Sequence, residues 1–246
     1  MKQFGLIGFP LGHSFSKKYF TEKFERENIA ARYDLYELSD ISEFEVLKNK
    51  PELCGLNVTI PYKEKVIQYL DELDDTAAQI GAVNVIRFIR ENDGALRLKG
   101  YNSDAIGFDS SIKPLLKAHH KRALILGTGG ASKAIDYVLR KNGIETTFVS
   151  RKSKPGLFTY DQLDKTILAD NLIIVNASPV GTFPHSDECP DIPYQYLSDK
   201  HLLYDVVYNP AETLFLKNGK KQGTQVVNGE GMLIGQAVAA WRIWNL

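Results

Sequence analysis

The sequence has no net charge, little cysteine and no long hydrophobic run. Lys and Arg together number 30, as do Asp and Glu, so the formal charge is zero. A neutral chain lacks the basic field that holds nucleic acid or an anionic membrane surface, so we expect neither as a partner. The apolar run near the N-terminus stops before Gly12, which predicts neither a secretory signal nor a membrane span.

Cysteine occurs only at Cys54 and Cys189. These positions have no metal-ligand spacing and make no disulfide framework, so we expect no metal site. Two isolated thiols indicate a reducing compartment, and the predicted location is the cytoplasm. The chain has 246 residues, of which 43% are hydrophobic and 24% charged, which is enough for one large or two modest globular domains.

The stretch from Asn57 to Lys63 is the most informative part of the chain. Residues 54–58 read as a short apolar strand, and Pro61 ends its ladder because proline has no N–H to donate. Lys63 is then predicted in the first turn of a helix that runs through Leu70. A cation there opposes the helix dipole, at a cost of some tenths of a kcal/mol.

A lysine held at the end of a buried strand, beside Asn57 and Thr59, is suited to proton transfer. The alternative is a solvated surface lysine, which is the commoner state of an isolated lysine. The neighbouring motifs favour the functional interpretation.

The N-terminal part of the chain alternates predicted strands and helices, as an α/β layer does. Ser14 and Ser16 precede the first helix; serines there are usually caps, but they also suit a bound carboxylate. The strands are expected at residues 3–8, 33–38, 54–58, 82–89 (with Asn84) and 96–98, and the helices at 17–28, 42–48 (with Phe44, Val46 and Leu47 inward) and 76–80. Asn92-Asp93-Gly94 is a turn signal that predicts a hairpin between the last two strands.

Residues 122–149 have the pattern of a dinucleotide-binding βαβ unit. A strand at 122–126 leads into the glycine-rich turn 127–132, a helix at 133–141 and a second strand at 146–149. Ser132 stands where G-x-G-x-x-G has its third glycine. An NAD site would place Asp or Glu after the second strand, but Ser150-Arg151-Lys152 follows here, which favours the 2′-phosphate of NADP over a merely solvated loop.

Three more strands are predicted at residues 172–175, 202–207 and 225–228. In an open α/β sheet the ligand lies beyond the carboxyl ends of the strands, where this chain has polar or glycine-rich segments. The last helix, 232–244, is expected to bury Ile234, Val238 and Trp241 as a stripe. Asp104 precedes another predicted helix. An aspartate in this position is more often an N-cap or a first-turn acid of the helix than a functional residue.

These motifs together resemble the shikimate dehydrogenase family over nearly the full length. The resembling segments are His13-Ser14-Phe15-Ser16, Asn57-Val58-Thr59-Ile60-Pro61-Tyr62-Lys63, Gly81-Ala82-Val83-Asn84, Asn102-Ser103-Asp104, Gly127 to Ala131, and Gly231-Met232 through Gln236-Ala237. The chain departs from the family at Lys17, Thr182 and Val85, and at Ser150 and Lys152 around the arginine that contacts NADP.

The resemblance implies a role for each matching residue. Lys63 and Asp104 would form the catalytic pair, and Arg151 would bind the 2′-phosphate. Substrate would be bound by Ser14, Ser16, Thr59, Asn84 and Gln236, with Tyr208 nearby, and cofactor by Gly127, Gly129, Gly130, Ala131, Ser150, Arg151, Lys152 and Gly229.

The resemblance also implies the architecture: an α/β fold with an N-terminal substrate-binding domain, residues 1–102 plus 232–246, and a Rossmann-type NADP-binding domain, 103–231. The active site would lie in the interdomain cleft. The implied reaction is the reversible NADPH-dependent reduction of 3-dehydroshikimate to shikimate, by a monomer or homodimer. The alternatives are a quinate/shikimate dehydrogenase that uses NAD, and a non-catalytic binding relative.

Overall fold

The computed structural model describes residues 1–12, 14–91 and 94–246. The chain divides into two compact units. Unit 1 comprises residues 1–103 and 236–246, and unit 2 comprises residues 104–235. The predicted motif residue His13, and Asn92 and Asp93 of the predicted turn, lie outside the described residues.

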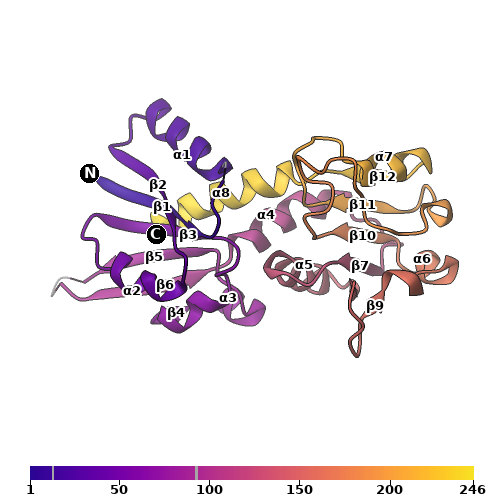
Figure 1. Ribbon diagram of the computed structural model, residues 1–246, viewed down its shortest axis with the longest axis horizontal. Helices are drawn as coiled ribbons and strands as arrows, with labels where there is room; N and C mark the ends of the chain where they lie inside the picture. The colour runs from indigo at the N-terminus through magenta and orange to yellow at the C-terminus, as the bar shows by residue number, and fades with distance from the viewer. Residues whose placement is uncertain (13, 92–93) are drawn as a thin grey trace. The chain divides into compact units, whose positions relative to one another are not determined.

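Unit 1 is built on a six-stranded mixed sheet in the order β2-β1-β3-β5-β6-β4 (Figure 1). Strands β1, β2 and β3 are parallel, whereas β5 is antiparallel to both β3 and β6. The strands are β1 (Lys2–Gly8), β2 (Ala31–Glu37), β3 (Leu53–Val58), β4 (Glu72–Leu73), β5 (Val85–Arg90) and β6 (Leu96–Tyr101). The antiparallel β5–β6 pair agrees with the predicted hairpin.

Helices cover both faces of this sheet and bury two hydrophobic clusters (Figure 1). One face packs against α1 (Phe15–Arg26) and the end of α8 (Glu230–Trp244), through Phe20, Phe24 and Trp244. The other packs against η1 (Ile41–Glu43), α2 (Phe44–Leu47), η2 (Lys65–Tyr69) and α3 (Asp75–Ile80). Gly55 in β3 makes room for the indole, since a Cβ there would lie 2.3 Å from Trp244 Cδ1.

Unit 2 is built on a six-stranded parallel sheet in the order β12-β11-β10-β7-β8-β9 (Figure 1). Its strands are β7 (Arg122–Leu126), β8 (Glu145–Ser150), β9 (Phe158–Thr159), β10 (Ile173–Asn176), β11 (Leu202–Asp205) and β12 (Gln225–Val227). Because every paired strand is parallel, the carboxyl ends lie at one edge, as the sequence predicted.

The helices of unit 2 also lie on both faces of its sheet. Its helical elements are α4 (Ser103–Ile112), η3 (Lys113–Leu115), α5 (Gly130–Lys141), η4 (Tyr160–Gln162), α6 (Lys165–Asp170), η5 (Tyr194–Tyr196), α7 (Leu214–Lys221) and the start of α8. Residues of α6 and α7 share one core cluster with Leu124, Ile174 and Leu203. On α4, Phe108 packs edge-on to Tyr204 at a centroid distance of 5.0 Å.

Some details of the predicted elements are wrong. Val46 was expected to face inward but is 78% exposed, because α2 is one turn long and buries only Phe44 and Leu47. The predicted stripe of α8 is wrong at Ile234, which is 42% exposed, whereas Trp241 packs against the core cluster that also contains Ala237 and Ala240. The short strands β4 and β9 and the helices α6 and α7 were not expected from the sequence.

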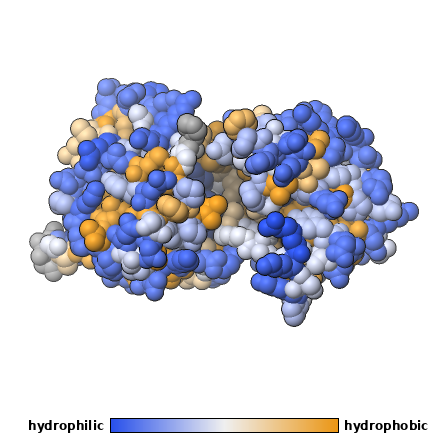
Figure 2. All heavy atoms as spheres, in the orientation of Figure 1, coloured by the Kyte–Doolittle hydropathy of each residue, from blue (hydrophilic) through white to orange (hydrophobic). Residues whose placement is uncertain are grey.

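The face of the molecule drawn in Figure 2 is largely polar. Figure 2 shows hydrophilic residues over most of the face in view, with hydrophobic residues in small separate groups. In residues 1–12, 14–91 and 94–246, none of the helices has the length and apolar character needed to cross a bilayer.

Candidate functional site

In unit 1, the polar residues singled out from the sequence gather at one edge of the sheet. Thr59 directly follows β3, and Asn84 directly precedes β5, which runs antiparallel to β3. Val85 also pairs with Tyr101 at the end of β6, so Asn102 and Ser103 lie at this edge as well. Residues distant in the sequence are therefore neighbours here because of the strand order.

Lys63 lies in a turn rather than in a helix. The element after it is the five-residue 3-10 helix η2, which starts at Lys65, so the predicted position in the first turn of an α-helix is wrong. Pro61 and the turn bond from Tyr62 N to Thr59 O prevent a regular helix from starting earlier. The main chain of Lys63 is nevertheless fixed, because its carbonyl accepts a hydrogen bond from Val83 N at 2.7 Å.

The two serines near the start of α1 have different local roles. Ser14 is the N-cap, and its hydroxyl accepts a hydrogen bond from Lys17 N at 3.3 Å. Ser16 lies in the first turn of the helix and is half-buried. Ser14 therefore has the N-cap role that was considered from the sequence. Because its oxygen accepts the bond from the helix, its hydroxyl proton points away from the helix N–H groups.

Buried amides connect β3, β5 and the start of α4. Asn57 is 4% exposed, and its amide donates to Asn84 O at 3.3 Å. The Asn84 side chain donates to Ser103 Oγ at 3.0 Å and accepts from Ser103 N at 2.6 Å. Asn84 is therefore held in one orientation by the residue next to Asp104. These partners were not recognised from the sequence, because nothing local marks them.

The other residues implied for catalysis and substrate binding lie on three separate elements. Asp104 is buried in the first turn of α4, which is the local position expected from the sequence. Gln236 is half-buried on α8, in the part of that helix that belongs to unit 1. Tyr208 is 40% exposed and follows β11 in unit 2.

The glycine-rich turn of unit 2 has the geometry that the sequence predicted. Gly127 has φ of 112°, a conformation that glycine adopts without strain. Gly129 is the N-cap of α5 and, having no side chain, makes no side-chain cap hydrogen bond. Ser132 replaces the third glycine and is buried, and its hydroxyl donates to Gly129 O at 2.5 Å. The departure from G-x-G-x-x-G therefore preserves the turn.

The segment after β8 is basic and exposed. Arg151, Lys152 and Lys154 are all solvent-accessible, and Figure 2 shows a strongly hydrophilic group of residues over the segment that joins β8 to β9. Ser150 accepts a hydrogen bond from Lys152 N at 3.2 Å, which holds the start of this segment. A group of exposed cations near the glycine turn suits a phosphate group.

Close packing requires glycine at position 229, which the family resemblance implies is also a cofactor-binding residue. A Cβ at this position would lie 2.1 Å from Val206 O, so the chain after β12 touches the chain after β11. Only glycine permits this approach.

A buried carboxylate, Asp205, was not recognised from the sequence. It is fully buried at the end of β11 and accepts hydrogen bonds from Asn176 Nδ2 at 2.9 Å, Val207 N at 3.0 Å and Thr213 Oγ1 at 2.6 Å. Burial raises the pKa of Asp205 to about 6, and the hydrogen bonds offset only part of that rise. Asp205 thus links the end of β10, the segment after β11 and the N-cap of α7 by hydrogen bonds.

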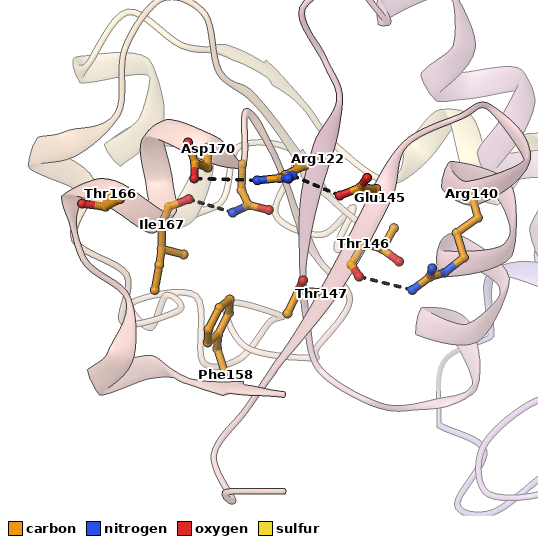
Figure 3. Close-up of a pocket in the computed structure, with 10 residues that line it drawn as sticks. Arg122, Arg140, Glu145, Thr146, Thr147, Phe158, Thr166, Ile167 and Asp170 are labelled. Carbon is orange, nitrogen blue, oxygen red and sulfur yellow. Dashed lines mark hydrogen bonds and ion pairs between the residues drawn. The ribbon is translucent and has the colours of Figure 1, made fainter. Parts of the chain in front are cut away.

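A pocket of about 440 Å³ lies elsewhere in unit 2 (Figure 3). Arg122 and Glu145, at the amino ends of β7 and β8, contribute to its lining, so it is at the edge opposite the glycine turn. Arg122 is paired with Glu145 at 3.0 Å and with Asp170 at 3.8 Å. The pocket contains none of the predicted site residues.

Comparison with known proteins identifies the family. Residues 6–86 match the family model described as the shikimate dehydrogenase substrate binding domain. A shikimate dehydrogenase (NADP(+)) of Methanosphaera stadtmanae is 37% identical over 260 residues, which cover 98% of this chain and 90% of the relative. The chain belongs to the shikimate dehydrogenase family.

Solved structures of shikimate dehydrogenases have the same fold. The Aquifex aeolicus enzyme aligns with a TM-score of 0.85 at 32% identity, covering 99% of this chain and 92% of that one. The Thermus thermophilus enzyme, in complex with NADP(H) and shikimate, aligns with a TM-score of 0.84 at 28% identity, covering 99% and 93%. The predicted family and α/β fold class are confirmed.

Proposed function

We propose that Lys63 and Asp104 carry the chemical step of the NADP-dependent shikimate dehydrogenase activity of this chain. That activity, predicted from the sequence, is confirmed by the curated relatives, and so is the NADP cofactor. Unit 1 is the proposed substrate-binding unit, supported by the family match over residues 6–86, and unit 2 the proposed NADP-binding unit.

The residues of unit 2 fit a dinucleotide. The turn at Gly127 to Ala131 leaves the start of α5 without a side-chain cap, which suits a diphosphate, and a Cβ at Gly129 would meet no atom within 4 Å. Ser150, Arg151 and Lys152 would bind the 2′-phosphate, with Gly229 beside the cofactor. When bound, NADPH supplies the hydride that reduces the ketone.

Lys63 stabilises the alkoxide that develops on the substrate and donates the proton. Asp104 orients the ammonium group of Lys63. In the oxidation of shikimate Lys63 must first be neutral to act as the base. The fixed main chain of Lys63, bonded to Val83, supports this role, because a proton donor must be held within hydrogen-bond reach of the reacting oxygen.

The substrate carboxylate is bound by Ser14 and Ser16, at the positive end of α1. The ring hydroxyls are bound by Thr59, Asn84 and Gln236, with Tyr208 nearby. The proposed location is the cytoplasm, which rests on the two free cysteines, Cys54 and Cys189.

The basic segment after β8, with no acid at the position that NAD enzymes use, is the observation that favours the biosynthetic NADP enzyme. The test is reduction of NADP⁺ by purified protein with shikimate, followed by absorbance, and then the same assay with NAD⁺ or quinate. We expect fast turnover only with shikimate and NADP⁺.

The alternatives give different outcomes in the same assay. Comparable rates with NAD⁺ or quinate would identify a quinate/shikimate dehydrogenase of broader specificity. Binding of shikimate without any turnover would identify a non-catalytic relative and contradict the roles given to Lys63 and Asp104.

A further inference from the structure

Asn176 is a buried residue of unit 2 that does not belong to the set implied by the family resemblance. It is the last residue of β10 and is 0% exposed. Its Nδ2 donates to Asp205 Oδ1 at 2.9 Å and to Val180 O at 3.2 Å. Its Oδ1 accepts from Ser178 N at 3.2 Å and from Ser178 Oγ at 2.6 Å. Both protons and both lone pairs of the amide are thus used.

Asp205 determines which way this amide points. With a pKa of about 6, the buried carboxyl is ionised at pH 7 and only accepts hydrogen bonds, so the NH₂ group of Asn176 faces it. The amide oxygen then faces Ser178, where a flipped amide would oppose one donor to another. In this orientation Asn176 folds residues 177–180, here called the β10 loop, back onto the end of its strand.

The β10 loop lies against the glycine turn. Ala177 N donates to Leu126 O at 3.0 Å, and a Cβ at Gly127 would lie 3.4 Å from the peptide group that joins Ala177 to Ser178. The turn is also held from its other side, where Gly127 N donates to Val149 O at 2.9 Å. The position of the β10 loop therefore depends on Asn176, whereas the glycine turn has a support of its own.

These two segments flank the point where the strand order of unit 2 reverses (Figure 1). From β7 the chain passes through α5 to β8, and after β9 it returns through α6 to β10 on the other side of β7. Dinucleotides bind at such a point, beyond the carboxyl ends of the strands. Arg151, proposed to bind the 2′-phosphate of the adenosine, follows β8, so the nicotinamide half belongs on the β10 side.

We propose that Asn176, oriented by Asp205, is a positioning residue for the nicotinamide half of NADP and acts by folding the β10 loop against the glycine turn. This inference rests on the proposed role of unit 2 as the NADP-binding unit. Because Asn176 is fully buried, it acts through the β10 loop, in which Ala177, Ser178 and Val180 are only half-buried.

Removal of the amide affects the two halves of the cofactor differently. Ser178 loses the acceptor of its N–H and hydroxyl, and Val180 O loses a donor, so the β10 loop is no longer held in one conformation. The nicotinamide half then loses one side of its site. The adenosine half keeps its proposed contacts, because the glycine turn and Arg151 do not depend on Asn176.

The test compares two ligands by calorimetry. One is NADP⁺, and the other is adenosine 2′,5′-bisphosphate, which has the adenosine half with its 2′-phosphate but no nicotinamide. In Asn176→Ala we expect the Kd for NADP⁺ to rise about tenfold and the Kd for the bisphosphate to change by less than about twofold. In steady-state assays the KM for shikimate should also change by less than about twofold.

A second variant keeps a partner for the buried carboxylate. Asn176→Ser leaves a hydroxyl that can donate to Asp205, but its shorter side chain lacks the amide that bonds to Ser178 and Val180. The same difference between the two ligands is expected. The matched control is Asn171→Ala, just before β10 at the other end of the strand. Asn171 is 8% exposed and its amide donates to Ile167 O at 2.8 Å, so its loss removes a buried amide bond without changing either Kd.

Three results would overturn the inference. They are a Kd for NADP⁺ within about twofold of wild type in the Asn176 variants, equal increases for the two ligands, and an equal increase for NADP⁺ in Asn171→Ala. Wild-type protein that binds neither ligand would instead refute the proposed role of unit 2.

Discussion

Unit 1 and unit 2 each bury a polar network at the strand edge where ligands are proposed to bind, but the two networks differ in charge. The network of unit 1 joins Tyr33, Asn57, Asn84 and Ser103, all of which are neutral. The network of unit 2 is centred on a carboxylate, Asp205, which accepts from two side chains and a backbone N–H.

The two networks differ in charge because the two sheet edges hold different groups in place. In unit 1, amides and hydroxyls from three elements are held in one orientation, and neutral groups do this at a small desolvation cost. In unit 2, one carboxylate is hydrogen-bonded to three segments, because its two oxygens accept several hydrogen bonds at once. The consequence is a buried charge, so we expect the stability of unit 2 to depend on pH and the network of unit 1 to be insensitive to it.

The largest effect is expected from Lys63→Ala in unit 1. Loss of the proton donor should lower kcat at least about 100-fold, with KM for shikimate changed by less than about threefold. Steady-state assays with shikimate and NADP⁺ measure both constants. The control is Lys65→Ala, which removes an exposed lysine two residues along the chain and is expected to be near wild type.

Normal turnover in Lys63→Ala would contradict the catalytic assignment. A rise in KM alone would make Lys63 a binding residue, and unit 1 would then contribute no group to the chemical step.

A smaller effect, on stability, is expected from Asp205→Asn. The pKa of Asp205 is about 6 in the folded chain and 3.8 is its usual value, so the folded state favours the proton more than the unfolded state does. The free energy of unfolding of the wild type therefore falls as pH rises from about 4 to about 6. The two pKa values differ by about two units, which corresponds to about 3 kcal/mol.

In Asp205→Asn this slope should be absent, because nothing titrates at that position. Asparagine keeps the oxygen that accepts from Asn176 and Val207, and Thr213 can turn its hydroxyl to accept from the new amide. Urea unfolding at pH 4.5 and pH 7 gives the comparison. The exposed Asp199→Asn variant is the control and should keep the wild-type slope; a wild-type slope in Asp205→Asn would show that the buried carboxylate is not the source.

The smallest effect is expected from Arg151→Ala in unit 2. Loss of one charge-assisted contact to the 2′-phosphate should raise KM for NADP⁺ about tenfold, while KM for shikimate and the rate with NAD⁺ are unchanged. Lys121→Ala, an exposed cation before β7 at the other edge of the sheet, is the control. An equal loss with NAD⁺ would mean that Arg151 contacts a part of the cofactor common to both.

Much of the fold was predictable because its signals are local. The strand before Gly127, the glycine turn and the helix after it follow one another within about twenty residues, and each has its own pattern of periodicity or backbone freedom. The site residues were found through the family resemblance, and their roles remain predictions. The errors at Val46 and Ile234 arose because helical spacing alone does not say which face meets the sheet.

The sequence by itself determined the α/β class, the family, the glycine turn and the basic segment that favours NADP, since these depend on residues near one another in the chain. Only the tertiary structure decided that Tyr33 meets Asn57, and that Asp205 is buried among Asn176, Val207 and Thr213. Such contacts depend on strand order and register, which bring together residues tens of positions apart and which no local pattern encodes.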